Sequence, residues 1–143
     1  MPAVTVVDRV AEHLKGHKVV NETLIKPDGT PLLIGDVKNR DVLIIDDEID
    51  TGGSICEDVE VAKANGARDI HVVFIHPVLS SNAAERLSAL PVKHFTTTNT
   101  IPIPDEKKKL FGRRLTILSI GPLLGEVIKR ANEGSSVGAM FNE

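Results

Sequence analysis

Aromatic side chains are scarce in this chain of 143 residues. It has no tryptophan, no tyrosine and four phenylalanines. A nucleobase is commonly held by stacking on an aromatic ring or on the plane of an arginine. The chain therefore offers few side chains on which an adenine base could stack.

Disulfides, excess positive charge and long apolar runs are missing as well. The one cysteine, Cys56, excludes an internal disulfide and fits a reducing cytoplasm. The net charge of −3 argues against a general nucleic-acid binder. No apolar run approaches the ~20 residues needed to span a membrane, and the N-terminus shows no secretion signal. We therefore expect a cytoplasmic protein of one domain, residues 1–143, with neither nucleic acid nor membrane as a partner.

Strand-like and helix-like segments alternate through most of the chain. Strands are predicted from residue 42 and over residues 70–75, 92–96 and 115–119, and helices over residues 54–65, 81–90 and 123–132. Ser81 is the expected cap of the second helix, and Val127 and Ile128 would face inward on the third. This order predicts an α/β fold, an open and mostly parallel twisted sheet flanked by helices.

Three further segments depart from this alternation. Residues 5–14 have helical spacing, although the stretch AVTVV is equally compatible with a strand. Residues 21–35 favour a hairpin-like excursion or a mobile loop, with a turn at residues 27–29. The run Lys107, Lys108 and Lys109 is expected to be the solvated face of a loop.

Residues 42–54, VLIIDDEIDTGGS, hold the densest concentration of chemically active groups. Four branched apolar residues indicate a buried strand, and the glycines that follow allow a tight turn into a helix. The start of that helix would present unpaired N–H groups to an anion such as a phosphate. Three carboxylates would repel a bound anion unless they accept hydrogen bonds from sugar hydroxyls or hold a divalent cation. The stretch therefore predicts a site for a phosphorylated sugar, with Mg²⁺.

Three other interpretations of the same stretch are weaker. The strand ending in acidic residues is similar to the Mg²⁺-holding strand of P-loop NTPases, but no GxxxxGK[ST] motif occurs in the chain. The acidic spacing also matches four ligand positions of an EF-hand loop, yet Thr51 stands where that loop requires glycine. An ordinary turn with solvated acids is the third interpretation.

The carboxyl ends of the predicted parallel strands are expected to gather further polar residues. Ligands bind at this edge of open α/β sheets. Asp46, His76 and residues 97–100 would meet there. His76, at the end of its strand, is therefore a candidate ligand contact.

The stretch at residues 42–54 resembles the signature by which phosphoribosyl pyrophosphate and ribose 5-phosphate are bound. The form that includes Asp50 is closest to that of ribose-phosphate pyrophosphokinase. Other similar segments are IGDVKNR at 34–40, HPVLS at 76–80, TNTIP at 98–102 and the tail from residue 118. The resemblance covers residues 34–141 and leaves residues 1–33 as an atypical N-terminal segment.

The resemblance implies the C-terminal half of such an enzyme, with a phosphoribosyltransferase-like, Rossmann-type fold. The implied reaction transfers the β,γ-diphosphoryl group of ATP to the C1 hydroxyl of ribose 5-phosphate. Asp46 and Asp47 would hold the ribose hydroxyls, directly or through Mg²⁺. The 5-phosphate would be held by Asp50, Thr51, Gly52, Gly53 and Ser54.

The resemblance also implies what this chain lacks. Much of the family's ATP site belongs to another half, and Lys26 is the one basic residue where the family has a basic catalytic loop. No residue is assigned to the transfer step beyond Lys26 as a candidate, so we expect low or no activity from this chain alone. The family habit implies a homo-oligomer. Two alternatives stay open, a small phosphoribosyltransferase and a non-catalytic module that binds sugar phosphates.

Overall fold

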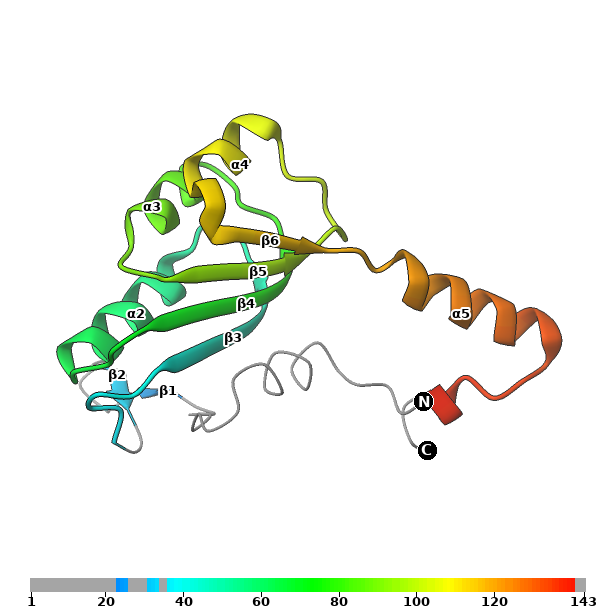
Figure 1. Cartoon of the computed structure of the whole chain (residues 1–143), viewed down its shortest axis with the longest axis horizontal. Helices are drawn as coiled ribbons and strands as arrows, with labels where there is room; N and C mark the ends of the chain where they lie inside the picture. Colours follow the sequence, from blue (N-terminus) through cyan, green and yellow to red (C-terminus); the bar gives the residue numbers. More distant parts are fainter. Residues whose placement is uncertain (1–22, 26–30, 34–35, 141–143) are drawn as a thin grey trace. The chain divides into compact units, whose positions relative to one another are not determined.

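The computed structural model describes residues 23–25, 31–33 and 36–140 (Figure 1). Its described residues divide into two compact units, one ending at Leu118 and the other beginning at Ser119. The expectation of one domain stays a prediction.

A four-stranded parallel sheet forms the centre of the first unit. Its strands follow one another in space as they do in sequence: β3 (Val42–Ile49), β4 (Ile70–Pro77), β5 (His94–Thr98) and β6 (Leu115–Leu118). The pairings β3–β4, β4–β5 and β5–β6 are all parallel. The predicted α/β fold with a parallel sheet is therefore confirmed.

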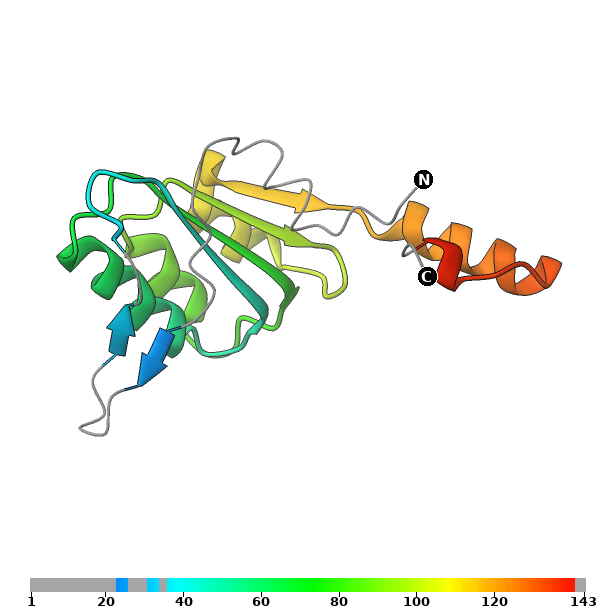
Figure 2. The same cartoon turned by 90° about the horizontal axis from the view of Figure 1, so that it is seen from below.

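Helices α2 (Gly53–Ala64), α3 (Ala83–Ala89) and α4 (Asp105–Phe111) connect these strands, and Figures 1 and 2 show them on one side of the sheet. The core lies between this side of the sheet and the helices. Its strand residues include Ile70, Val72, Phe74 and Phe95, all at 0% exposure. The rings of Phe95 and Phe111 meet edge to face with centroids 5.1 Å apart. Three of the four phenylalanines, Phe74, Phe95 and Phe111, thus serve the core and are not free to stack on a base.

The segment before β3 is described only in part. Strands β1 (Thr23–Ile25) and β2 (Pro31–Leu33) pair antiparallel, which confirms the strands of the predicted hairpin. The predicted helix at residues 5–14, the turn at residues 27–29 and Lys26 lie outside the described residues.

The structure corrects two local predictions in the first unit. Lys107, Lys108 and Lys109 belong to helix α4, in which Asp105 and Glu106 suit the first turn and Lys108 and Lys109 the last. Helix α3 begins after Asn82, and no side chain caps it. Ser81 has a φ of +49°, which differs from the extended backbone of a capping serine.

Helix α5 (Gly121–Glu133) and the short helix η2 (Gly138–Met140) are the elements described in the second unit. Val127 and Ile128 were predicted to face inward, but no residue of α5 is buried and Ile128 is 67% exposed. An amphipathic pattern shows that a helix has an apolar face and does not show what covers it. Among the described residues, no helix is long and apolar enough to cross a membrane.

His71, on β4, should make the free energy of unfolding depend on pH. Burial lowers the pKa of His71 below its ordinary value of 6.5, and the charge of Lys93 lowers it further, against the opposing effects of Asp41 and Asp69. The native state therefore binds this proton less tightly than the unfolded chain does. Stability should be full above pH 6.5 and fall, by about a few tenths of a kcal/mol after solvent screening, as the pH drops toward the lowered pKa.

Urea unfolding of the wild type and of His71→Gln at pH 7.5 and pH 5.5 measures this effect. The variant should lose less stability between the two pH values than the wild type. An equal loss in both proteins would assign the pH dependence to other groups.

Candidate functional site

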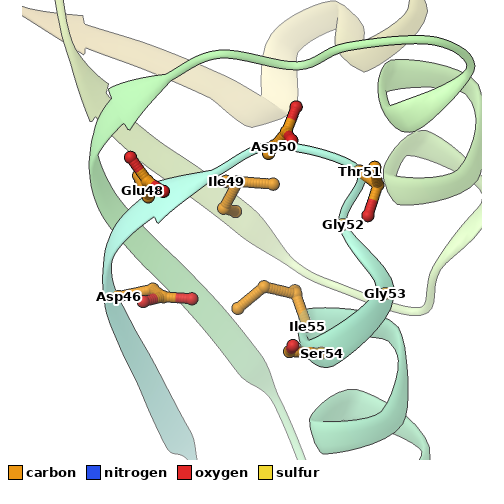
Figure 3. A pocket seen from close by; sticks show the side chains of 9 residues that line it. All are labelled: Asp46, Glu48, Ile49, Asp50, Thr51, Gly52, Gly53, Ser54 and Ile55. Atoms are coloured by element: carbon orange, nitrogen blue, oxygen red, sulfur yellow. The ribbon is translucent and has the colours of Figure 1, made fainter.

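A pocket of about 190 Å³ lies where strand β3 ends and helix α2 begins (Figure 3). It is lined by Asp46, Glu48, Ile49, Asp50, Thr51, Gly52, Gly53, Ser54 and Ile55. Its volume is below the ~300–1,000 Å³ typical of sites for drug-sized ligands. The pocket therefore suits a compact polar ligand.

Gly52 makes the turn between the strand and the helix. Its φ of +74° is in the left-handed region, and a Cβ there would lie 3.4 Å from the side chain of Leu87. A glycine fits this position because it adopts the conformation without strain and leaves room for the leucine. The first helical hydrogen bond then runs from the N–H of Cys56 to the carbonyl of Gly52.

The start of α2 gives the pocket its capacity for an anion. The N–H groups of Gly53, Ser54 and Ile55 precede the first helical hydrogen bond, so they have no partner within the helix. The hydroxyls of Thr51 and Ser54 add further donors at the same place. Together with the positive end of the helix dipole, these groups favour a phosphate.

The Asp46 carboxyl supplies the opposite charge. Figure 3 shows it directed toward the start of α2. Burial raises the pKa of Asp46 above its ordinary value, and the neighbouring carboxyls of Asp47 and Asp58 raise it further, against the hydrogen bond from the Asp47 N–H, which lowers it. This carboxylate is therefore poorly compensated within the protein, and a cation or a hydroxyl donor would stabilise it.

Six of the seven residues predicted to bind ribose 5-phosphate line the pocket, and Asp47 does not. Asp47 is exposed next to Asp46, whose Oδ1 accepts the Asp47 N–H at 2.9 Å. Glu48, Ile49 and Ile55 line the pocket without having been predicted. For Glu48 a signal existed, because alternate residues of a strand share a face and Glu48 stands two positions after Asp46.

His76 lies at the carboxyl end of β4 but not among the pocket residues. Its Nδ1 lies 3.0 Å from the Thr100 hydroxyl. The hydroxyls of Thr98 and Thr100 both donate to the carbonyl of Ile75. Of the predicted group, His76 and the threonines do meet, in hydrogen bonds that join the end of β4 to the end of β5. Asp46 lies apart from them in the pocket, which His76 does not line.

A comparison with protein families matches residues 6–142 to the phosphoribosyl synthetase-associated domain. The match spans nearly the whole chain. The chain belongs to this family.

Individual relatives of the phosphoribosyl synthetase-associated domain agree with this assignment. A ribose-phosphate pyrophosphokinase of Deinococcus radiodurans is 38% identical over 85% of this chain and 37% of its own length. One of Oceanobacillus iheyensis is 35% identical over 97% of this chain and 44% of its own length. The resemblance to that family found in the sequence is confirmed. The chain spans about two fifths of the length of these relatives.

A solved structure agrees as well. The crystal structure of phosphoribosylpyrophosphate synthetase from Mycobacterium smegmatis matches with a TM-score of 0.70 at 33% identity, over 91% of this chain and 42% of that one. The phosphoribosyl synthetase-associated domain described here therefore has the fold of one part of that enzyme.

Proposed function

We propose that this domain binds ribose 5-phosphate in the pocket between β3 and α2, as the acceptor-binding part of a ribose-phosphate pyrophosphokinase. The observation that carries the proposal is the pairing of acidic groups on the strand with N–H and hydroxyl donors at the helix start in one small pocket. The donors suit the 5-phosphate, and the Asp46 carboxylate suits the ribose hydroxyls.

The same pocket would accommodate Mg²⁺. This ion keeps several waters and is usually bound through one or two carboxylates together with substrate phosphates. Asp46, Glu48 and Asp50 supply oxygen donors of this kind. Within residues 36–140 and the two short strands before them, no three His, Cys, Asp or Glu side chains form a ready-made metal site. The donors therefore fit an ion that arrives with the sugar phosphate, held by Asp46 with Asp47 beside it.

The proposed domain would position the acceptor for transfer of a diphosphoryl group from ATP. Mg²⁺, when bound, supplies charge neutralisation for such a transfer. The chain's own groups hold the acceptor: backbone N–H groups fix the phosphate, and a carboxylate orients the sugar. Much of the adenine contact would have to come from another part of the enzyme, since Phe95 and Phe111 are buried in the core. We also propose self-association, which a native mass measurement would test.

Calorimetric titration with ribose 5-phosphate, in the presence and absence of Mg²⁺, tests the binding proposal. Phosphorus NMR of the same protein with ATP, ribose 5-phosphate and Mg²⁺ tests activity. Binding with AMP formation supports an active enzyme, and binding without AMP supports an acceptor-binding part. Release of pyrophosphate from phosphoribosyl pyrophosphate only with a base present would instead indicate a phosphoribosyltransferase. Absence of sugar-phosphate binding would overturn the proposal.

A further inference from the structure

The carbonyl groups of three consecutive residues, 49–51, accept hydrogen bonds from a donor segment, residues 79–86, that lies outside the pocket lining. The carbonyl of Ile49 accepts from the N–H of Leu79 at 2.9 Å, and that of Asp50 accepts from the N–H of Ser80 at 3.0 Å. The carbonyl of Thr51 accepts from the Arg86 guanidinium at 3.2 Å. Leu79 and Ser80 follow the end of β4 and Arg86 belongs to helix α3, and none of the three lines the pocket.

This arrangement sets the direction of the backbone N–H groups in the turn. In a trans peptide group the C=O and the N–H point in opposite directions, and the described residues contain no cis peptide bond. A carbonyl held toward the donor segment therefore turns the next residue's N–H to the other side. The N–H groups of Asp50, Thr51 and Gly52 are directed in this way away from the three donors, none of which lines the pocket.

The donor segment is itself held in place. Leu79 is 1% exposed, and its carbonyl accepts a 2.6 Å hydrogen bond from Lys107 of α4. Leu79 and Ser81 have φ values of +48° and +49°, which residues other than glycine seldom adopt. Backbone strain of this kind persists where the surrounding contacts enforce it, often next to a functional site. These contacts therefore hold the donor segment in a defined conformation.

We propose that Arg86 is a positioning residue for the phosphate-binding turn. Its guanidinium is the one side-chain donor among the three contacts, so a mutation can remove it, whereas the other two are backbone groups. Arg86 is exposed and approaches the turn from α3, while Leu87 fills the space beneath Gly52. The inference rests on the proposed function for its ligand, but the orientation of the turn can be tested without any ligand.

The test compares the whole chain with its Arg86→Met and Arg86→Lys variants. Methionine keeps much of the apolar stem and removes the donors, whereas lysine keeps a charged donor. Arg113→Met, which removes an exposed arginine that takes no part in the hydrogen bonds to the turn, is the matched control. The first measurement is the set of backbone amide chemical shifts of residues 50–53 by NMR, without ligand. The second is the Kd for ribose 5-phosphate at about 50 mM and about 500 mM NaCl.

Arg86→Met should shift the amide signals of the turn and raise the Kd about five- to tenfold, the size expected for the loss of one ordinary hydrogen bond. The increase should persist at high salt, because a lost positioning contact is not screened. Arg86→Lys should retain the Kd within about threefold, and Arg113→Met should change neither measurement.

Unchanged turn amides in Arg86→Met would overturn the inference. A loss of affinity that disappears at high salt would also overturn it, because Arg86 would then act on the ligand only through its long-range charge. Shifted amides in a protein that does not bind ribose 5-phosphate would support the positioning role and reject the proposed ligand. If Arg86→Met does not fold, Arg86→Ala, which also removes the donor and favours the helix, decides between the same outcomes by the same amide shifts and salt dependence.

Discussion

Replacing Gly52 with valine should raise the Kd for ribose 5-phosphate about a hundredfold or more. Gly52 has a φ of +74°, and its missing Cβ would lie 3.4 Å from the Cδ2 of Leu87. A β-branched residue adopts this conformation only at a cost of about 1–3 kcal/mol, and its extra methyl groups would crowd the side chain of Leu87. The turn would relieve this strain by rotating its peptide groups, which removes N–H donors from the phosphate. A loss of about 2.7 kcal/mol in binding corresponds to the hundredfold change.

Gly66→Val is the matched control for this prediction. Gly66 has a φ of +84°, and a Cβ there would lie 3.3 Å from the Cγ of Lys38, so strain and crowding are similar. It follows the other end of α2, about 18 Å along a helix of 12 residues. Both variants should lose thermal stability, and the affinity loss should appear in Gly52→Val alone, measured by calorimetric titration. Equal affinity in the two variants would show that the turn does not bind the phosphate.

The sequence was sufficient to locate the pocket because the determinants of this turn are local. An apolar run followed by Asp50 and two glycines specifies a strand end, a tight turn and a helix start within a few residues. The parallel sheet followed in the same way from the alternation of segments. Each of these features depends on neighbours in the chain, and the structure places them where the pattern indicated.

The contacts that fix the turn from outside could not be predicted. Arg86 reaches Thr51 across 35 positions, and Lys107 reaches Leu79 across 28. Neither residue belongs to a motif whose spacing indicates a partner, and a lysine run is most often solvated. Such pairings depend on how α3 and α4 pack against the sheet, which is a property of the assembled core. The apolar face of α5 is a similar case, because its pattern gives no information on what lies against it.

The two neighbouring aspartates of β3, Asp46 and Asp47, should behave differently, although the sequence analysis predicted one role for both. Asp46→Asn should raise the Kd for ribose 5-phosphate about tenfold to a hundredfold, because it removes a charged hydrogen-bond acceptor from the pocket. Asp47→Asn, which removes the same charge from a carboxyl outside the pocket lining, should raise it about threefold. Calorimetric titration of both variants with and without Mg²⁺ makes the comparison, and the Mg²⁺ dependence should be reduced most in Asp46→Asn.

The same substitution should make the free protein more stable. The pKa of Asp46 is raised in the native state by burial and by the Asp47 and Asp58 carboxyls, so the folded protein binds this proton more tightly than the unfolded chain. The ionised carboxylate thus opposes folding at neutral pH, and stability is gained as the pH falls through the raised pKa toward 3.8. Asparagine removes that charge while keeping the oxygen that accepts the Asp47 N–H. A higher Tm at pH 7 together with weaker binding would identify Asp46 as a group kept for its ligand at the expense of stability, whereas a lower Tm with unchanged affinity would make it a structural residue.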